Sequence, residues 1–216
     1  MSEFLSCVIL VDGEGTITGV VGGDLQQHAS CWKAGANPKR AHEVTWPQDD
    51  DGRSLRIRAL GESGGQLHGG AYELLRDRLL HQWPTRDALL VQLLRQGIGP
   101  EGQWAGDLYL GVPTLTAEVR AELARLTTVG LSLHAGGLTE AKGAFPALAT
   151  VGRNLYADGL TEAKGAFPAL TTVGWSLYAD GLTEAKGAFP ALTTVGWSLY
   201  ADGLTEAKGA FPALTT

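Results

Sequence analysis

Gly181-Leu-Thr-Glu-Ala-Lys-Gly-Ala-Phe-Pro-Ala-Leu192 decides the fold of the C-terminal half of this chain, because the same stretch occurs four times. The copies occupy residues 137–148, 159–170, 181–192 and 203–214, so each of their positions recurs after 22 residues. A fixed period in this range is typical of a solenoid, in which every unit buries its apolar face against its neighbours. We therefore expect stacked coils over residues 101–216.

Each repeat also contains a stretch with the periodicity of a strand, residues 175–180. Leu177 and Ala179 alternate there with Tyr178 and Asp180. Since successive side chains of a strand point to opposite faces, Leu177 and Ala179 are expected to face the interior. The strands of successive units should pair in parallel, about 4.8 Å apart.

The rest of the unit supplies the return path of the coil. Phe189 and Leu192 are expected to be buried, and Val173 to belong to an internal row of apolar side chains. Residues 183–186 are expected to form one helical turn that ends at a glycine.

Residues 170–182, Leu-Thr-Thr-Val-Gly-Trp-Ser-Leu-Tyr-Ala-Asp-Gly-Leu, resemble leucine-rich repeats, in particular the irregular bacterial and receptor-L-domain-like kinds. The resemblance covers roughly residues 104–216. The sequence departs from the common form because it lacks the asparagine or cysteine that usually follows the strand, and because Ala179 stands where a larger aliphatic residue is usual. The resemblance implies a binding scaffold, since such folds seldom carry catalysis themselves.

The N-terminal region has the mixed pattern of an α+β domain. Residues 4–11 and 16–21 are apolar and β-branched on either side of a glycine-rich turn, which predicts a hairpin. Shorter strands are expected at 31–32, 43–46 and 55–60, and apolar periodicity predicts helices over 71–83 and 85–97. We therefore expect a small α+β capping domain at 1–100, followed by a parallel β-solenoid of leucine-rich-repeat type at 101–216.

Composition and charge exclude several classes of protein. The net charge is −6, and neither half of the chain carries the basic surface that direct nucleic-acid binding requires. The first residues do not show a basic region, an apolar run and a small-residue cleavage site, so no secretory leader is expected, and the longest apolar run, residues 8–11, is far too short to span a membrane. A soluble cytoplasmic protein is expected.

No pair or group of residues predicts a metal or cofactor site. Cys7 and Cys31 do not match a zinc spacing. His28 and His42 could in principle converge with them on a metal, but small buried cysteines and incidental histidines are the expected situation. We expect no cofactor.

Residues 61–65, Gly-Glu-Ser-Gly-Gly, match the G-x-S-x-G pattern of a nucleophile elbow around Ser63. That elbow requires a helix to begin directly after the serine, and further glycines intervene here. A glycine-rich loop and a protein that is not an enzyme are therefore expected, with a small serine hydrolase as an alternative.

Aromatic and acidic residues recur on the strands of the solenoid and form the candidate binding site. Exposed tyrosine and tryptophan side chains dominate the energetics of many interfaces, although stacked rings can also be purely structural. Arg153 stands at the tryptophan position one unit earlier, which indicates that this position reaches solvent. The predicted partner-binding residues are Tyr156, Asp158, Trp175, Tyr178, Asp180, Trp197, Tyr200 and Asp202.

These rows favour a non-enzymatic scaffold that binds a partner protein through the repeat face. The near-identity of the copies suits fast-evolving genes, so an inhibitor from a phage or mobile element that blocks a nucleic-acid-binding surface of a host defence complex is an alternative. A carbohydrate-binding module using the aromatic rows is another. A homodimer through the C-terminal end is expected as well, because the last repeat has no polar cap.

Overall fold

The computed structural model describes residues 4–22, 41–47, 54–60, 65–161, 165–183, 187–204 and 211–215. The chain divides into two compact units, Met1–Gly97 and Ile98–Thr216. The predicted short strand at residues 31–32 lies outside the described residues.

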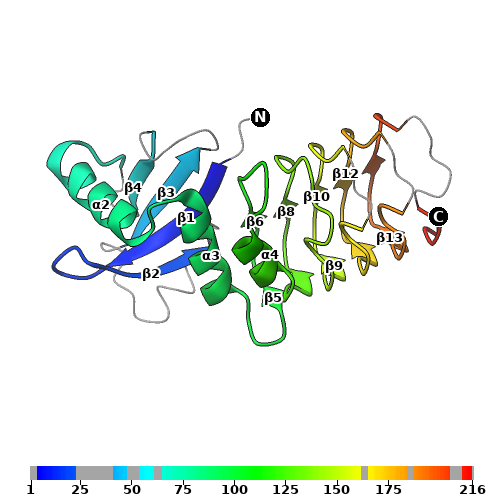
Figure 1. Cartoon of the computed structure of the whole chain (residues 1–216), viewed down its shortest axis with the longest axis horizontal. Helices are drawn as coiled ribbons and strands as arrows, with labels where there is room; N and C mark the ends of the chain where they lie inside the picture. Colours follow the sequence, from blue (N-terminus) through cyan, green and yellow to red (C-terminus); the bar gives the residue numbers. More distant parts are fainter. Residues whose placement is uncertain are drawn as a thin grey trace. The chain divides into compact units, whose positions relative to one another are not determined.

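The N-terminal unit contains an antiparallel four-stranded sheet in the order β2-β1-β3-β4 (Figure 1). Its strands are β1 (Phe4–Val11), β2 (Ile17–Gly22), β3 (Ala41–Pro47) and β4 (Arg56–Leu60). The hairpin predicted from the first two apolar stretches is confirmed, because β1 pairs with β2. β1 also pairs with β3, so it is a central strand, and its residues from Leu5 to Ile9 are buried.

Two helices complete this unit, α2 (Gly69–Gln82) and α3 (Arg86–Gly97). The Thr85 hydroxyl caps α3 by accepting a hydrogen bond of 3.2 Å from the amide of Ala88. α3 packs on β1 and β2. Both predicted helices are confirmed.

The C-terminal unit is a parallel β-solenoid, as predicted. Every coil contributes two short strands, and each strand pairs in parallel with its counterpart in the next coil, so the strands lie side by side along this unit (Figure 1). Sheet I comprises β5 (Gln103–Trp104), β7 (Thr128–Val129), β9 (Thr150–Val151), β11 (Thr172–Val173) and β13 (Thr194–Val195). Sheet II comprises β6 (Leu108–Tyr109), β8 (Leu133–His134), β10 (Leu155–Tyr156), β12 (Leu177–Tyr178) and β14 (Leu199–Tyr200).

The core of the solenoid consists of rows of identical side chains. Leu177 and Ala179 are fully buried, which confirms the predicted inward face of the strand. Phe189 and Leu192 are fully buried too. The ring of Phe167 lies between those of Phe145 and Phe189, with centroids 4.9 and 5.4 Å apart, so the phenylalanine row forms a continuous internal stack.

The bend between the two strands of a coil requires glycine. A Cβ atom on Gly174 would lie 2.1 Å from the carbonyl oxygen of Gly152 in the preceding coil. No side chain fits in that space, so this bend can approach the backbone of the preceding coil closely only because Gly174 has no Cβ atom.

The return path of the coil differs from the prediction. Residues 184–186 of the predicted helical turn lie outside the described residues, but the equivalent segment of the first copy, residues 139–142, is not helical. The strand of sheet I was also not predicted, because two residues such as Thr172 and Val173 are too few to show a period.

A further helix, α4 (Ala117–Leu123), lies in the first, degenerate repeat. The Thr116 hydroxyl accepts a hydrogen bond from the amide of Val119 and caps the helix. Val119 and Leu123 are buried on one face of it. α4 lengthens this coil, so that Ser132 hydrogen-bonds Asp107 across 25 residues where later coils are joined across 22.

Candidate recognition face of the solenoid

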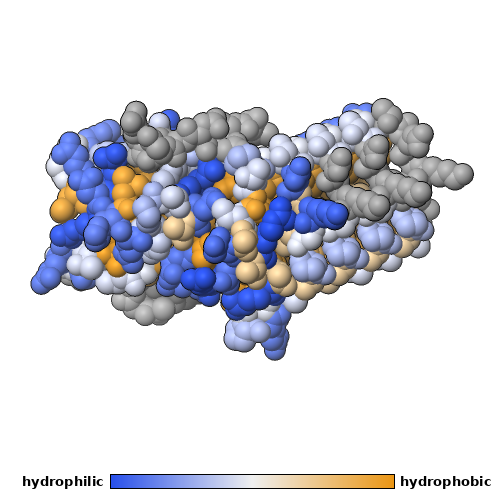
Figure 2. Space-filling view, in the orientation of Figure 1, coloured by the Kyte–Doolittle hydropathy of each residue, from blue (hydrophilic) through white to orange (hydrophobic). Residues whose placement is uncertain are grey.

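The outer surface of sheet II carries a stack of aromatic rings that we call the tyrosine ladder. It consists of Tyr109, His134, Tyr156, Tyr178 and Tyr200. Their ring centroids lie 4.0, 4.6, 4.8 and 4.8 Å apart in that order, and neighbouring ring planes differ by at most 16°. Figure 2 shows that similarly coloured side chains repeat in rows along this unit.

Stacking decides which part of each tyrosine can reach a partner. Both faces of the Tyr156 and Tyr178 rings are covered by neighbouring rings, so they present mainly their edges. Tyr200 is 42% exposed. Burial raises the pKa of Tyr156, and the nearby Tyr178, Asp107 and Asp158 raise it further, while Asn154 opposes them through a hydrogen bond. The phenol therefore stays protonated and acts as a neutral donor or acceptor at neutral pH.

His134 occupies the ladder position that tyrosine holds in the other coils. Burial between its neighbours lowers its pKa, and the negative charge of Asp107 partly opposes this shift. A neutral imidazole can stack on the rings of Tyr109 and Tyr156 without a desolvated charge.

Two residues beyond each later tyrosine stands an aspartate, and Asp158, Asp180 and Asp202 form the aspartate row. All three residues are exposed. Asp180 Oδ1 accepts a hydrogen bond of 3.1 Å from the backbone amide of Asp202, so the row also joins one coil to the next. Although Asp158 is exposed, partial desolvation by its surroundings and the negative charge of Asp180 raise the pKa of its carboxyl group, and hydrogen bonds from backbone amides partly oppose the shift. The row is thus a set of mutually repelling carboxylates held by the fold.

The bend before each sheet II strand carries the third row, Arg153, Trp175 and Trp197. The indole rings of Trp175 and Trp197 stack with centroids 4.9 Å apart and planes 1° apart. The Arg153 guanidinium lies over the other side of Trp175, 4.8 Å from the ring centroid. Trp175 is therefore half-buried in a sandwich, whereas Trp197 is 72% exposed.

The eight predicted binding residues thus fall on the strands of sheet II, on the bend that precedes each strand and in the turn that follows it. Sequence reasoning missed that Asp107 and Asn154 bind the next coil through side-chain oxygens, which accept hydrogen bonds of 2.7 and 3.1 Å from the amides of Ser132 and Ser176. Their position directly before the strand leucine was the available signal. Glu140 and Lys142 of the first copy of the repeat are exposed.

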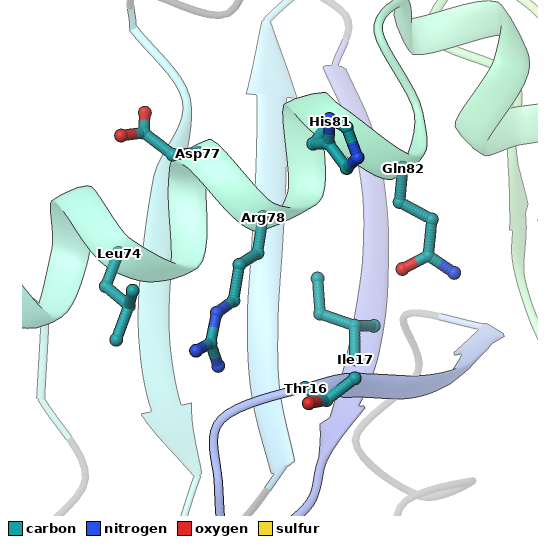
Figure 3. Close-up of a pocket in the computed structure, with 7 residues that line it drawn as sticks. All are labelled: Thr16, Ile17, Leu74, Asp77, Arg78, His81 and Gln82. Carbon is teal, nitrogen blue, oxygen red and sulfur yellow. The ribbon is translucent and has the colours of Figure 1, made fainter.

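The N-terminal unit contains a pocket of about 650 Å³ between α2 and the start of β2 (Figure 3). Leu74, Arg78 and Gln82 extend from α2 toward Thr16 and Ile17. Arg78 donates a hydrogen bond of 2.7 Å to the carbonyl oxygen of Glu14, so its guanidinium is used to hold the hairpin turn.

The candidate chemistry of the N-terminal unit is only partly described. Ser63 lies outside the described residues, and α2 begins at Gly69 rather than directly after that serine. His28 and Cys31 also lie outside, and no group of metal-binding side chains occurs among the residues that the structure describes. Cys7 is buried, which together with the charge of Glu43 raises its pKa to about 12, so the thiol is not ionised at neutral pH.

No family model, no curated protein and no solved structure matches this chain. In the described ranges of the sequence, no helix combines the length and the apolar character needed to cross a membrane.

Proposed function

We propose that this protein is a non-enzymatic scaffold that binds a partner protein through the recognition face, which we define as the later coils' tyrosine edges, aspartate row and tryptophans. The observation that carries the proposal is the exposed aspartate row beside the tyrosine ladder. Asp158, Asp180 and Asp202 repeat in register with the strands of sheet II, so the same polar group is offered at each strand spacing, about 4.8 Å. Such an extended, repetitive surface suits a macromolecule.

The aspartate row opposes the stability of the fold, which supports a role in binding. The negative charge of Asp180 makes ionisation of Asp158 harder, yet an uncharged side chain could make the same inter-coil bond, as Asn154 does. Polar groups that oppose stability are typical of binding sites, where the partner supplies the compensating interaction.

Stacking within the tyrosine ladder makes this row a poorer fit for a carbohydrate than for a protein partner. Sugars bind aromatic residues by lying on open ring faces, but the inner rings of the tyrosine ladder have both faces covered. Tyrosine edges with a hydroxyl group, beside carboxylates, suit hydrogen bonds and salt bridges to a polypeptide.

The test compares capture of proteins from native-host extract by the wild type and by a face variant with Tyr178→Phe, Tyr200→Phe, Asp180→Asn and Asp202→Asn. These changes keep the stacked rings and an acceptor oxygen at each aspartate, so the fold is expected to persist. A matched control carries Thr172→Ser and Thr194→Ser on sheet I. We expect a stoichiometric partner that the wild type and the control retain and that the face variant loses. Equal capture by all three proteins, or capture of nothing by the wild type, would overturn the proposal.

We further propose that the coils are of the leucine-rich-repeat type and that two copies associate through the last coil. The 22-residue period and the buried Leu177 and Leu182 support the leucine-rich-repeat type.

The burial of leucines in the last coil supports the association of two copies. Leu199 and Leu214 of that coil are only half-buried, whereas Leu177 and Leu192 one coil earlier are fully buried. Light scattering at micromolar concentration tests the association, and a monomer would contradict it.

A further inference from the structure

The chain itself shows what the tryptophan position can bind. Arg153, Trp175 and Trp197 occupy the same place in three successive coils, and Trp175 receives the Arg153 guanidinium on one side and the Trp197 ring on the other. A guanidinium and an indole are thus both accepted as stacking neighbours at this bend. The contact of Arg153 with Trp175 is a cation–π interaction within the solenoid.

Among the described residues, Trp197 has one stacking neighbour, Trp175, whereas Trp175 has two. The Trp197 indole rests on Trp175 and is 72% exposed. A large exposed aromatic side chain that is held in place on one side is the kind of group that anchors an interface, because little conformational freedom remains to be lost on binding.

The charge of the surroundings selects the occupant. The chain carries a net charge of −6, and the exposed carboxylates of Asp180 and Asp202 lie in the turns that follow the strands of sheet II, on the same coils as Trp175 and Trp197. Such a surface attracts a cation and repels an anion. Of the two basic side chains, arginine stacks on an aromatic ring better than lysine, because the guanidinium is planar and weakly hydrated.

We propose that the partner is held through an arginine side chain whose guanidinium stacks on the exposed indole of Trp197, reproducing the contact that Arg153 makes with Trp175. This inference rests on the protein-binding function proposed above. It names the chemistry of the partner, a basic polypeptide surface with an accessible arginine, and it gives Trp197 the role of anchor.

The test uses two capped, alanine-based helical peptides, one with three arginines and one with three lysines at the same positions. Binding to the full chain is measured by calorimetry and by the indole N–H resonance of Trp197, which is identified by its loss in Trp197→Phe. We expect the arginine peptide to shift this resonance and to bind about threefold to tenfold more tightly than the lysine peptide. The preference should vanish in Trp197→Ala.

A matched control separates stacking from charge. The double variant Asp180→Asn, Asp202→Asn is expected to lower the affinity for both peptides by a similar factor. The arginine peptide should still bind more tightly than the lysine peptide. Equal affinities of the two peptides for the wild type, or a preference that persists in Trp197→Ala, would overturn the inference.

Failure of the inference is distinguishable from failure of the proposed function. A partner that the face variant loses but Trp197→Ala retains would leave the binding function intact and overturn the arginine contact. Arginine-selective peptide binding without any captured partner would support the contact and overturn the proposed function.

Discussion

The carbonyl oxygen of Gly152 lies 2.1 Å from the place where a Cβ atom on Gly174 would stand. The same relationship joins Gly196 to Gly174, at 2.0 Å. The spacing of successive coils at the bend is therefore set by backbone packing against backbone. A single methyl group there would force two coils apart or distort the bend.

Gly174→Ala is accordingly expected to destabilise the C-terminal unit by about 1–3 kcal/mol, the usual cost of overpacking a close contact. Denaturant unfolding followed by circular dichroism measures the change. The control is Gly99→Ala in the same unit, where the nearest atom would be at an ordinary distance of 3.6 Å. If Gly174→Ala were as stable as the wild type, the coils would be able to move apart at this bend without a loss of unfolding free energy.

Phe167→Ala is expected to cost about 3–5 kcal/mol of unfolding free energy, because it empties the centre of the internal phenylalanine stack. Phe167 is fully buried between two other rings. The same change at Phe211, which is only half-buried in the last coil, should cost clearly less. Equal losses at the two positions in the same unfolding assay would contradict the burial gradient.

His134 should make the stability of the solenoid sensitive to mild acid. Burial lowers the pKa of this imidazole below its usual value of 6.5 in the folded chain. As the pH falls through 6.5, the unfolded chain therefore takes up the proton first, and the free energy of unfolding decreases until the folded-state pKa is passed. His134→Tyr completes the tyrosine ladder and should remove this part of the pH dependence. Unfolding free energies of both proteins at pH 7.5 and 5.5 test this, and equal slopes would refute it.

Asp158→Asn is expected to raise the melting temperature at pH 7. Partial desolvation and the charge of Asp180 raise the pKa of Asp158 above its usual value of 3.8, so the ionised form is disfavoured in the folded chain. The penalty is absent below pH 3.8, where the group is protonated in both states, and it appears as the pH rises through the folded-state pKa. Thermal denaturation at pH 7 and 3.5 measures the difference. A lower melting temperature at pH 7 would show that the hydrogen bonds of the carboxylate outweigh the repulsion.

The solenoid could be predicted from the sequence because the side chains that recur every 22 residues are buried in the same way in successive coils. Leu177, Ala179 and their counterparts Leu133, Ala135, Leu155 and Ala157 are all fully buried. The alternation within a strand and the 22-residue recurrence therefore indicate the same inward face. α4 was missed, although Thr116 as N-cap and the spacing of Val119 and Leu123 were visible signals. The 22-residue register breaks in this unit, so these residues do not recur in the other coils.

The candidate site was predicted only in part, because a sequence shows which residues form a row but not which of their surfaces stay open. Stacking covers both faces of the Tyr178 ring and leaves mainly its edge exposed, whereas much of the Trp197 ring stays exposed. These differences arise between coils, where each ring meets its copy. The pocket beside α2 was not predicted either, because it joins residues that are distant in sequence, such as Thr16 and Arg78.

The threonine that follows Leu170 and Leu192 shows how one coil is joined to the preceding one. Thr171 Oγ1 donates a hydrogen bond to the carbonyl oxygen of Ala149, and Thr193 Oγ1 makes the same bond to Thr171. Thr215 Oγ1 donates in the same way to the carbonyl oxygen of Thr193. Because these three joints are made alike, a whole unit of 22 residues could be inserted or removed among them and the joint would close again. The length of the solenoid can therefore change in steps of about 4.8 Å. A gene that gains or loses one unit changes the length of the protein, and the new joint repeats contacts that already exist between the other coils.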